Sequence, residues 1–143
     1  MMQLKPTLKL SMFKEIRIVQ NDTWNNVKNG EVSLCYFNNK KDTSGIDLTD
    51  VESVRAQSDA YINFRLHTGQ VGLFFIDEKY QNRSLGKQIL LKTISEMKMH
   101  DVPAVWAITA KGHPFWSNVF GKQFKYSSRP HRSVTGDGYI IHI

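Results

Sequence analysis

Cysteine is nearly absent from this chain: among 143 residues there is one, Cys35. A single cysteine excludes an internal disulfide framework and is typical of a reducing compartment. It lies within the apolar run 32–37, so we interpret it as a small buried core residue rather than a nucleophile. The five histidines are scattered and no histidine or cysteine spacing suits a metal ion, so we predict no metal site.

Long hydrophobic runs are missing as well. No window approaches the roughly 18 apolar residues of a membrane span, and residues 1–6 lack the apolar core of a signal peptide. We therefore expect a cytoplasmic protein with no membrane partner. Neither a Gly-x-Ser-x-Gly elbow nor a Walker-type Gly-Lys-Ser/Thr occurs, which argues against those hydrolase and nucleotide-binding classes.

What is present describes an ordinary globular protein. Hydrophobic residues make up 41% of the chain and charged residues 22%, and no repeat or linker divides it, so we expect a single domain over residues 1–143, as a monomer or homodimer. The net charge of +6 is spread along the chain. It suits a polyanionic cofactor, an acidic substrate or a nucleic acid without choosing among them.

One basic and aromatic cluster near the C-terminus is interpreted as a solvated hairpin face, with a nucleic-acid surface as the alternative. The cluster consists of Lys122, Phe124, Lys125, Tyr126, Arg129, His131 and Arg132.

The most informative stretch is residues 71–97. The apolar run 71–76 predicts a buried strand, a polar turn follows at 81–84, and apolar residues then recur at helical spacing from Leu85 to Met97. A strand, a tight loop and a helix start together form a common phosphate-binding arrangement, because free backbone N–H groups and the helix dipole face the anion. We therefore predict a pyrophosphate-bearing cofactor at residues 82–87.

The loop resembles the acyl-CoA site of the GCN5-related N-acetyltransferases, the GNAT superfamily. The signature of that family is Gln/Arg-x-x-Gly-x-Gly/Ala, and residues 81–86 read Gln-Asn-Arg-Ser-Leu-Gly. The departure is Ser84, where the family usually has glycine. Serine is small enough for close backbone approach, but a positive φ would strain it.

The order of the following elements supports the resemblance, which covers roughly residues 60–143. We expect a parallel strand at 102–108, a short aromatic-bearing helix at 113–121, and a hairpin of 124–128 with 139–143, turning near 136–138. The implied fold is α/β (α+β), a mixed and mostly antiparallel sheet flanked by helices. A splayed parallel strand pair in that sheet forms the acyl-CoA cleft.

The N-terminal half, which borders the acceptor site in the resembled family, is expected to begin with strands. We predict an edge strand at 4–10, a strand or helix start at 13–19, a short helix from Asp22 or Thr23 to Gly30, and a strand at 31–37. A polar loop at 38–44, a helix capped by Asp50, and a hairpin of strands 60–66 and 71–76 complete the expectation.

The resemblance implies an acetyl-CoA-dependent N-acyltransferase that acts on a primary amine of an acceptor. A backbone N–H near Phe75 or Ile76 is then expected to polarise the thioester carbonyl, and the 82–87 loop to hold the pyrophosphate, with Arg83 and Lys87 as nearby cations. The complete expected cofactor set is Phe75, Ile76, Gln81, Asn82, Arg83, Ser84, Leu85, Gly86 and Lys87.

The general base departs from the family. Many members carry a glutamate where this chain has Gln70, which cannot accept a proton at neutral pH. His67 is the first substitute, since histidine is the residue type that changes charge between pH 5 and 8. Asp77 and Glu78 lie beside the expected pyrophosphate and would repel it, so we interpret them as solvent-facing or helix-entry charges.

The general acid departs as well, because Ser117 occupies the usual tyrosine position. His113 and Tyr126 are its rivals. A thiolate can also leave with help from water, so the missing acid and base do not exclude catalysis. The alternatives to the acyltransferase are a nucleic-acid-binding or nucleic-acid-modifying protein on a similar scaffold, and a catalytically idle acyl-CoA-binding module.

Overall fold

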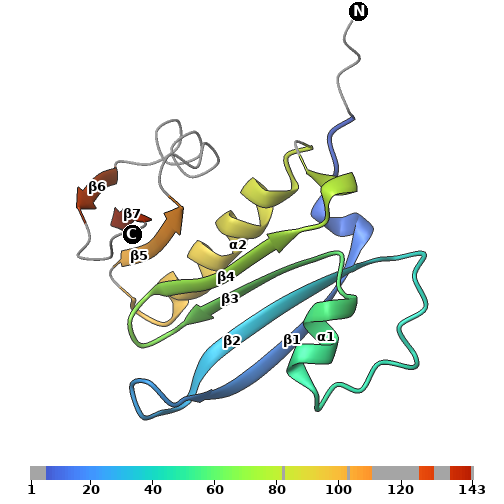
Figure 1. Cartoon of the computed structure of the whole chain (residues 1–143), viewed down its shortest axis with the longest axis horizontal. Coiled ribbons are helices and arrows are strands. Elements are labelled where there is room, and N and C mark those ends of the chain that lie inside the picture. The colour runs from blue at the N-terminus through green and yellow to red at the C-terminus, as the bar shows by residue number, and fades with distance from the viewer. Residues whose placement is uncertain (1–5, 82, 103, 111–125, 131–135, 143) are drawn as a thin grey trace, which may run out of the picture.

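The computed structural model describes residues 6–81, 83–102, 104–110, 126–130 and 136–142 of the chain. A seven-stranded sheet runs through it in the order β1-β2-β3-β4-β5-β7-β6. The strands are β1 Phe13–Asp22, β2 Val27–Asn38, β3 Ala60–Arg65, β4 Gln70–Ile76, β5 Ala104–Ala110, β6 Tyr126–Pro130 and β7 Gly136–His142. The helices are α1 Val51–Gln57 and α2 Leu85–Met99, with short 3-10 turns η1 Leu10–Met12 and η2 Glu78–Tyr80 (Figure 1).

Every strand pair in the sheet is antiparallel except β4 with β5, which is parallel. A parallel pair needs a crossover connection, and α2 supplies it between β4 and β5. The predicted α+β class, the mixed sheet and its single parallel pair are therefore confirmed.

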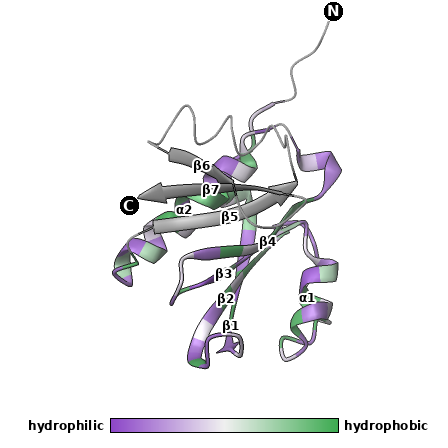
Figure 2. Ribbon diagram, turned by 60° about the vertical axis from the view of Figure 1, so that its left-hand side comes forward, coloured by the Kyte–Doolittle hydropathy of each residue, from purple (hydrophilic) through white to green (hydrophobic). Residues whose placement is uncertain are grey.

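The two helices cover opposite faces of strands β1 to β4 (Figure 2). Alternate residues of β2 and β3 meet α2 in the main core, which includes Leu34, Ile62 and Phe64 from the sheet and Ile89 from the helix. Cys35 and Phe37 point to the other face and pack with Val54 of α1. Burial raises the pKa of the Cys35 thiol to about 11, as the interpretation of this cysteine as a core residue requires.

Most predicted elements from residue 31 onward are present. The 31–37 strand is part of β2, Asp50 caps α1 by accepting the Ser53 N–H at 3.2 Å, and β3 and β4 form the expected hairpin. Gly69 in its turn has a φ of 75°, a conformation that glycine adopts without strain. The sequence left open whether residues 13–19 form a strand or start a helix, and the structure shows that they are part of strand β1.

Three predictions about local structure were wrong. The helix predicted from Asp22 or Thr23 to Gly30 is absent: residues 23–26 form a tight turn that joins β1 to β2, and residues 27–30 belong to β2. The Asp22 carboxylate accepts the N–H groups of Trp24 and Asn25, and the same bonding that caps a helix also closes a turn. Asn26 then takes a positive φ of 53°, which ends any helical path.

The edge strand predicted at 4–10 is absent over its described residues 6–10. This segment lies against the start of α2, with Leu8 buried in the main core. The glycines at 136–138 belong to β7 and do not form the hairpin turn, since Gly138 pairs with both Ile108 and Arg129. The predicted helix at 113–121 lies outside the described residues.

Among the described residues, no helix has the length and apolarity to cross a membrane.

Candidate functional site

The sheet divides in two where β4 meets β5. Their parallel ladder consists of Gln70 with Trp106 and Val71 with Ala107. Beyond these pairs β4 continues to pair with β3 as far as Ile76, and β5 continues to pair with β7 as far as Ala110. The pairing between the described parts of β4 and β5 therefore ends after Val71, and the two strands diverge. This divergence is the splay that the resemblance implied.

A β-bulge in β4 lies directly at this division. Ile62 of β3 pairs with Phe74, and Phe64 pairs with Val71, so Gly72 and Leu73 together face the single residue Asn63. Bulges redirect a strand and increase its twist. The bulge therefore explains why β4 turns away from β5 at this point.

Phe75 and Ile76 lie past the bulge, on the part of β4 that has no partner in the described part of β5. Successive N–H groups of a strand point to its two opposite edges. Since one edge of β4 is occupied by β3, one of these two N–H groups points toward the open edge. The expected carbonyl-polarising donor thus has a suitable position.

The loop after β4 leads straight into α2, as predicted. Gln81 Nε2 donates to the Ile76 carbonyl at 2.9 Å, which ties the loop back to the strand. Helix α2 starts at Leu85, and the first N–H groups of a helix have no acceptor within it. The amides of 85–87 are therefore placed for an anion, while Asn82 lies outside the described residues.

Ser84 adopts the left-handed conformation, with φ 66° and ψ 5°. A serine in this conformation is strained, as expected for a positive φ at this position. Its hydroxyl makes no capping hydrogen bond to the helix. Among the described residues, no hydrogen bond of the Ser84 side chain offsets the cost of this conformation, so the loop must be held by other contacts.

The two cations of the loop behave differently. Arg83 Nε donates to the Pro6 carbonyl at 2.9 Å, and its Nη1 lies 3.4 Å from the Lys79 carbonyl, so this guanidinium is engaged with backbone. Lys87 is half-buried and makes no ion pair with another described residue. Asp77 accepts the Lys79 N–H at 3.2 Å, the helix-entry role expected of it.

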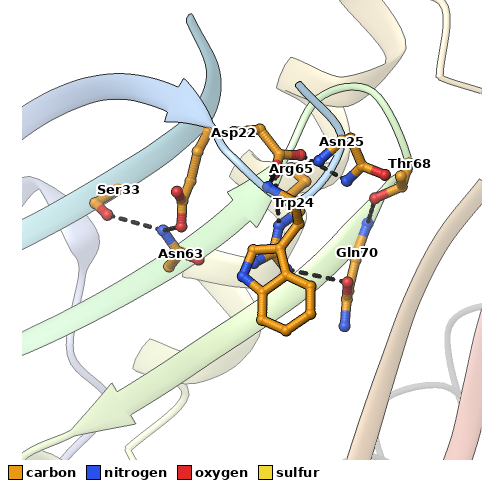
Figure 3. Close-up of polar contacts among 9 residues, drawn as sticks. Asp22, Trp24, Asn25, Ser33, Asn63, Arg65, Thr68 and Gln70 are labelled. Carbon is orange, nitrogen blue, oxygen red and sulfur yellow. Dashed lines mark hydrogen bonds and ion pairs between the residues drawn. The ribbon is translucent and has the colours of Figure 1, made fainter. Parts of the chain in front are cut away.

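A second group of polar side chains lies on the opposite face of the sheet from α2, at the start of β4 (Figure 3). Gln70 Oε1 accepts from Arg65 Nη1 at 3.0 Å, and Arg65 Nε lies 3.4 Å from Asp22 Oδ1. The Gln70 NH₂ makes no hydrogen bond with another residue that the structure describes, so its two N–H groups are open to a further contact. The position where the family has a base therefore presents a donor.

Asp22 is almost fully buried, at 1% exposure. Burial alone would raise the pKa of its carboxyl, but hydrogen bonds from Asn25 and Trp24 and the charge of Arg65 outweigh burial and lower the pKa. A buried carboxylate that is this well bonded holds Arg65 in place and is a poor proton acceptor.

Glu31 and Asn63 extend the same polar group toward the bulge. Asn63 Nδ2 donates to Glu31 Oε1 at 2.9 Å, and Asn63 Oδ1 lies 2.8 Å from the position that a Cβ on Gly72 would take. The half-buried carboxylate of Glu31 is thus connected to the division of the sheet through one side chain, that of Asn63. Sequence reasoning missed it, although Glu31 with Ser33, and Asn63 with Arg65, have the two-residue spacing of one strand face.

Of the predicted catalytic residues, His67 is the one whose side chain lies in the described part of the structure. His67 is exposed in the turn between β3 and β4 and makes no hydrogen bond or ion pair with another described residue. Tyr126 is the first residue of β6 and pairs with Ile141. Ser117 and His113 lie outside the described residues, as do the side chains of the basic cluster at 122–132. No group of three or more potential metal ligands occurs in the described part.

No protein-family model matches the chain, and no curated protein matches it in sequence. Solved structures do. A Klebsiella pneumoniae protein assigned as an acyl-CoA N-acyltransferase is similar over 92% of this chain and 98% of its own, with a TM-score of 0.65 and 10% identity. The PaiA N-acetyltransferase of Thermoplasma acidophilum, bound to coenzyme A, is similar over 80% of this chain and 62% of its own, with a TM-score of 0.58 and 10% identity.

A GNAT family acetyltransferase from Elizabethkingia anophelis, with acetyl-CoA bound, is similar over 80% of this chain and 77% of its own, with a TM-score of 0.56 and 10% identity. At these identities the likeness concerns the fold. This chain has the fold of the GNAT acetyltransferases, which confirms the fold that the loop sequence implied.

Proposed function

We propose that this protein is an acetyl-CoA-dependent N-acyltransferase of the GNAT superfamily that transfers the acetyl group to a primary amine. The observation that carries the proposal is the division of the sheet after Val71, directly followed by a loop and the free amides of 85–87. Two structures of the same fold were solved with coenzyme A or acetyl-CoA bound.

The donor side of the proposed site uses backbone more than side chains. The amides of 85–87 would hold the pyrophosphate, with Lys87 as the cation available beside them, and the open N–H at Phe75 or Ile76 would polarise the thioester carbonyl. Arg83 has a supporting role in this proposal, because its guanidinium is bonded to Pro6 and Lys79.

The acceptor amine would approach from the face that carries Gln70. Helix α2 covers the other face of β4, whereas α1 packs on the Gln70 face against residues of β1, β2 and β3. The amine must lose a proton before it attacks, and two residues are proposed to receive that proton. His67 follows from the sequence. Glu31 follows from the structure, which connects its carboxylate through Asn63 to the bulge of β4.

The test has a binding arm and a turnover arm. Thermal melting with CoA at ~100 times its dissociation constant should add ~2.7 kcal/mol of stability, a shift of several degrees for a domain of this size. Turnover is followed as thiol release from acetyl-CoA with a small amine, a peptide with a free N-terminus and a lysine-containing peptide. An unchanged melting temperature would contradict the proposal at its first step.

A second function, an acyl-CoA-binding module without catalysis, is favoured by Gln70 alone. An amide whose oxygen is bonded to Arg65 cannot accept a proton. This function predicts the same thermal shift with CoA but no thiol release with any of the amines. The turnover arm therefore separates it from the acyltransferase.

A further inference from the structure

The N-terminal segment, residues 6–10, is bonded to the loop that precedes α2. The Leu8 N–H donates to the Arg83 carbonyl at 2.9 Å, and Arg83 Nε donates to the Pro6 carbonyl at 2.9 Å. These two hydrogen bonds join parts of the chain that are more than seventy residues apart. Leu8 is also buried in the main core, which fixes the segment in place.

Gln88 completes this connection from the first turn of α2. Its Oε1 accepts the Leu10 N–H at 2.9 Å, while its Nε2 donates to the Leu8 carbonyl at 2.6 Å and to the Ser84 carbonyl at 3.1 Å. One side chain therefore binds the N-terminal segment on one side and the left-handed residue on the other.

Ser84 lies between these attachment points. Its neighbour Arg83 is held through its carbonyl and its side chain, and Ser84 itself is held through its own carbonyl. A residue other than glycine leaves the left-handed region readily unless its surroundings hold it there. The contacts to both sides of Ser84 are of the kind that this conformation requires.

We propose that residues 6–10 and Gln88 form a strap that keeps Ser84 left-handed and so keeps the amides of 85–87 in position for the CoA pyrophosphate. Glycine would adopt this left-handed conformation without strain, whereas Ser84 needs the contacts of the strap to stay in it. Gln88 is on this account a positioning residue. The part of the proposal that concerns CoA rests on the function proposed above, whereas the part that concerns the loop does not.

The test compares Gln88→Leu with the wild type. Leucine keeps an apolar stem of similar size and removes all three hydrogen bonds. The matched control is Gln57→Leu. Gln57, the last residue of α1, also donates its amide to the carbonyl four residues earlier, that of Ser53, but it lies on a different helix from the loop. If Gln88→Leu does not fold, Gln88→Glu replaces it, since glutamate loses both Nε2 donations and places a carboxylate against two carbonyls.

Two measurements are made on each variant. Amide hydrogen exchange without ligand should accelerate at the amides of residues 8 and 88 in the Gln88 variant, because these N–H groups are bonded to the carbonyls of Arg83 and Ser84. Their exchange should stay unchanged in the Gln57 control. Titration calorimetry with CoA should show binding about tenfold weaker in Gln88→Leu. The double variant Ser84→Gly/Gln88→Leu should bind CoA within about threefold of the wild type, because glycine needs no strap.

Unchanged exchange at residues 8 and 88 in the Gln88 variant overturns the strap, whatever happens with CoA. Accelerated exchange in the Gln88 variant, together with a wild-type protein that does not bind CoA, keeps the strap and overturns the proposed function. Weaker CoA binding that Ser84→Gly fails to restore also overturns the proposal, because the loss would then arise elsewhere than at the left-handed residue.

Discussion

Ser84→Gly should stabilise the protein, although it removes a side chain. Ser84 has a φ of 66° and makes no capping hydrogen bond with its hydroxyl. The left-handed conformation costs an L-residue roughly 1–2 kcal/mol, and glycine escapes this cost. Glycine also raises the entropy of the unfolded chain, which takes back about 0.4–1 kcal/mol. The expected net gain is therefore about 0.5–1 kcal/mol.

Two controls make the sign of this change informative. Ser84→Ala keeps the Cβ and the strain, so its stability should stay within about 0.5 kcal/mol of the wild type. Ser95→Gly makes the same substitution at an exposed position within α2, where it should destabilise, by roughly 0.5 kcal/mol. Urea unfolding and thermal melting measure all three variants, and Ser84→Gly should raise Tm by about 2–4 °C.

The outcome that refutes this reasoning is a Ser84→Gly variant less stable than the wild type. That result would mean that the serine side chain makes a contact which offsets its conformation. CoA affinity should be equal or tighter in the same variant. If Ser84→Gly abolished CoA binding, the hydroxyl itself would be a ligand contact and the loop would be more than a set of backbone amides.

Three further predictions concern the rest of the site. Gly86→Val should weaken CoA binding strongly with the far-UV circular dichroism retained, because the cofactor needs close approach to the loop backbone; equal affinity would remove the loop from the cofactor site. Asp22→Asn should cost about 3 kcal/mol at pH 7, since Arg65 is left without its buried partner. Because the pKa of the Asp22 carboxyl is lowered by folding, its stabilisation is present above the unfolded value of about 3.9 and is lost as the pH falls through the folded value. The difference between wild type and Asp22→Asn should therefore shrink below pH ~4, and a constant difference would contradict the sign. Glu31→Gln should lower kcat/KM by roughly 10²-fold or more and remove the rising limb of its pH profile, as loss of a general base does; the same loss in His67→Ala would assign the base to His67, and a profile that climbs to pH ~9 in both variants would assign the proton to water.

The strand and helix that carry the proposed donor side were predictable because their signals are local. The apolar run of 71–76, the polar turn and the helical spacing from Leu85 are contiguous, and each is decided by neighbours in sequence. The sequence shows that Ser84 stands at a position where the resembled family has glycine, but its positive φ became known only from the structure. The resemblance then supplied the parallel neighbour of β4.

The acceptor side was not predictable, because its contacts join distant residues. Asp22 was read as a helix cap, and only the pairing of β1 with β2 decides that its carboxylate closes a turn instead. The strap beside the proposed pyrophosphate loop was unpredictable for the same reason, since Leu8 and Gln88 are eighty residues apart in sequence and no local pattern connects them. Glu31 becomes a candidate general base only because the pairing of β2 with β3 brings Asn63 within hydrogen-bonding distance of it.

The central claim is that the amides at the start of α2 hold the pyrophosphate of acetyl-CoA. The most direct measurement is a titration of the ¹⁵N-labelled protein with CoA, followed by the amide resonances of residues 85–87. The account predicts that these resonances shift and saturate together, and that Lys87 and the open edge of β4 shift with them. Saturable CoA binding that leaves residues 85–87 unmoved, or no binding at millimolar CoA, would contradict it.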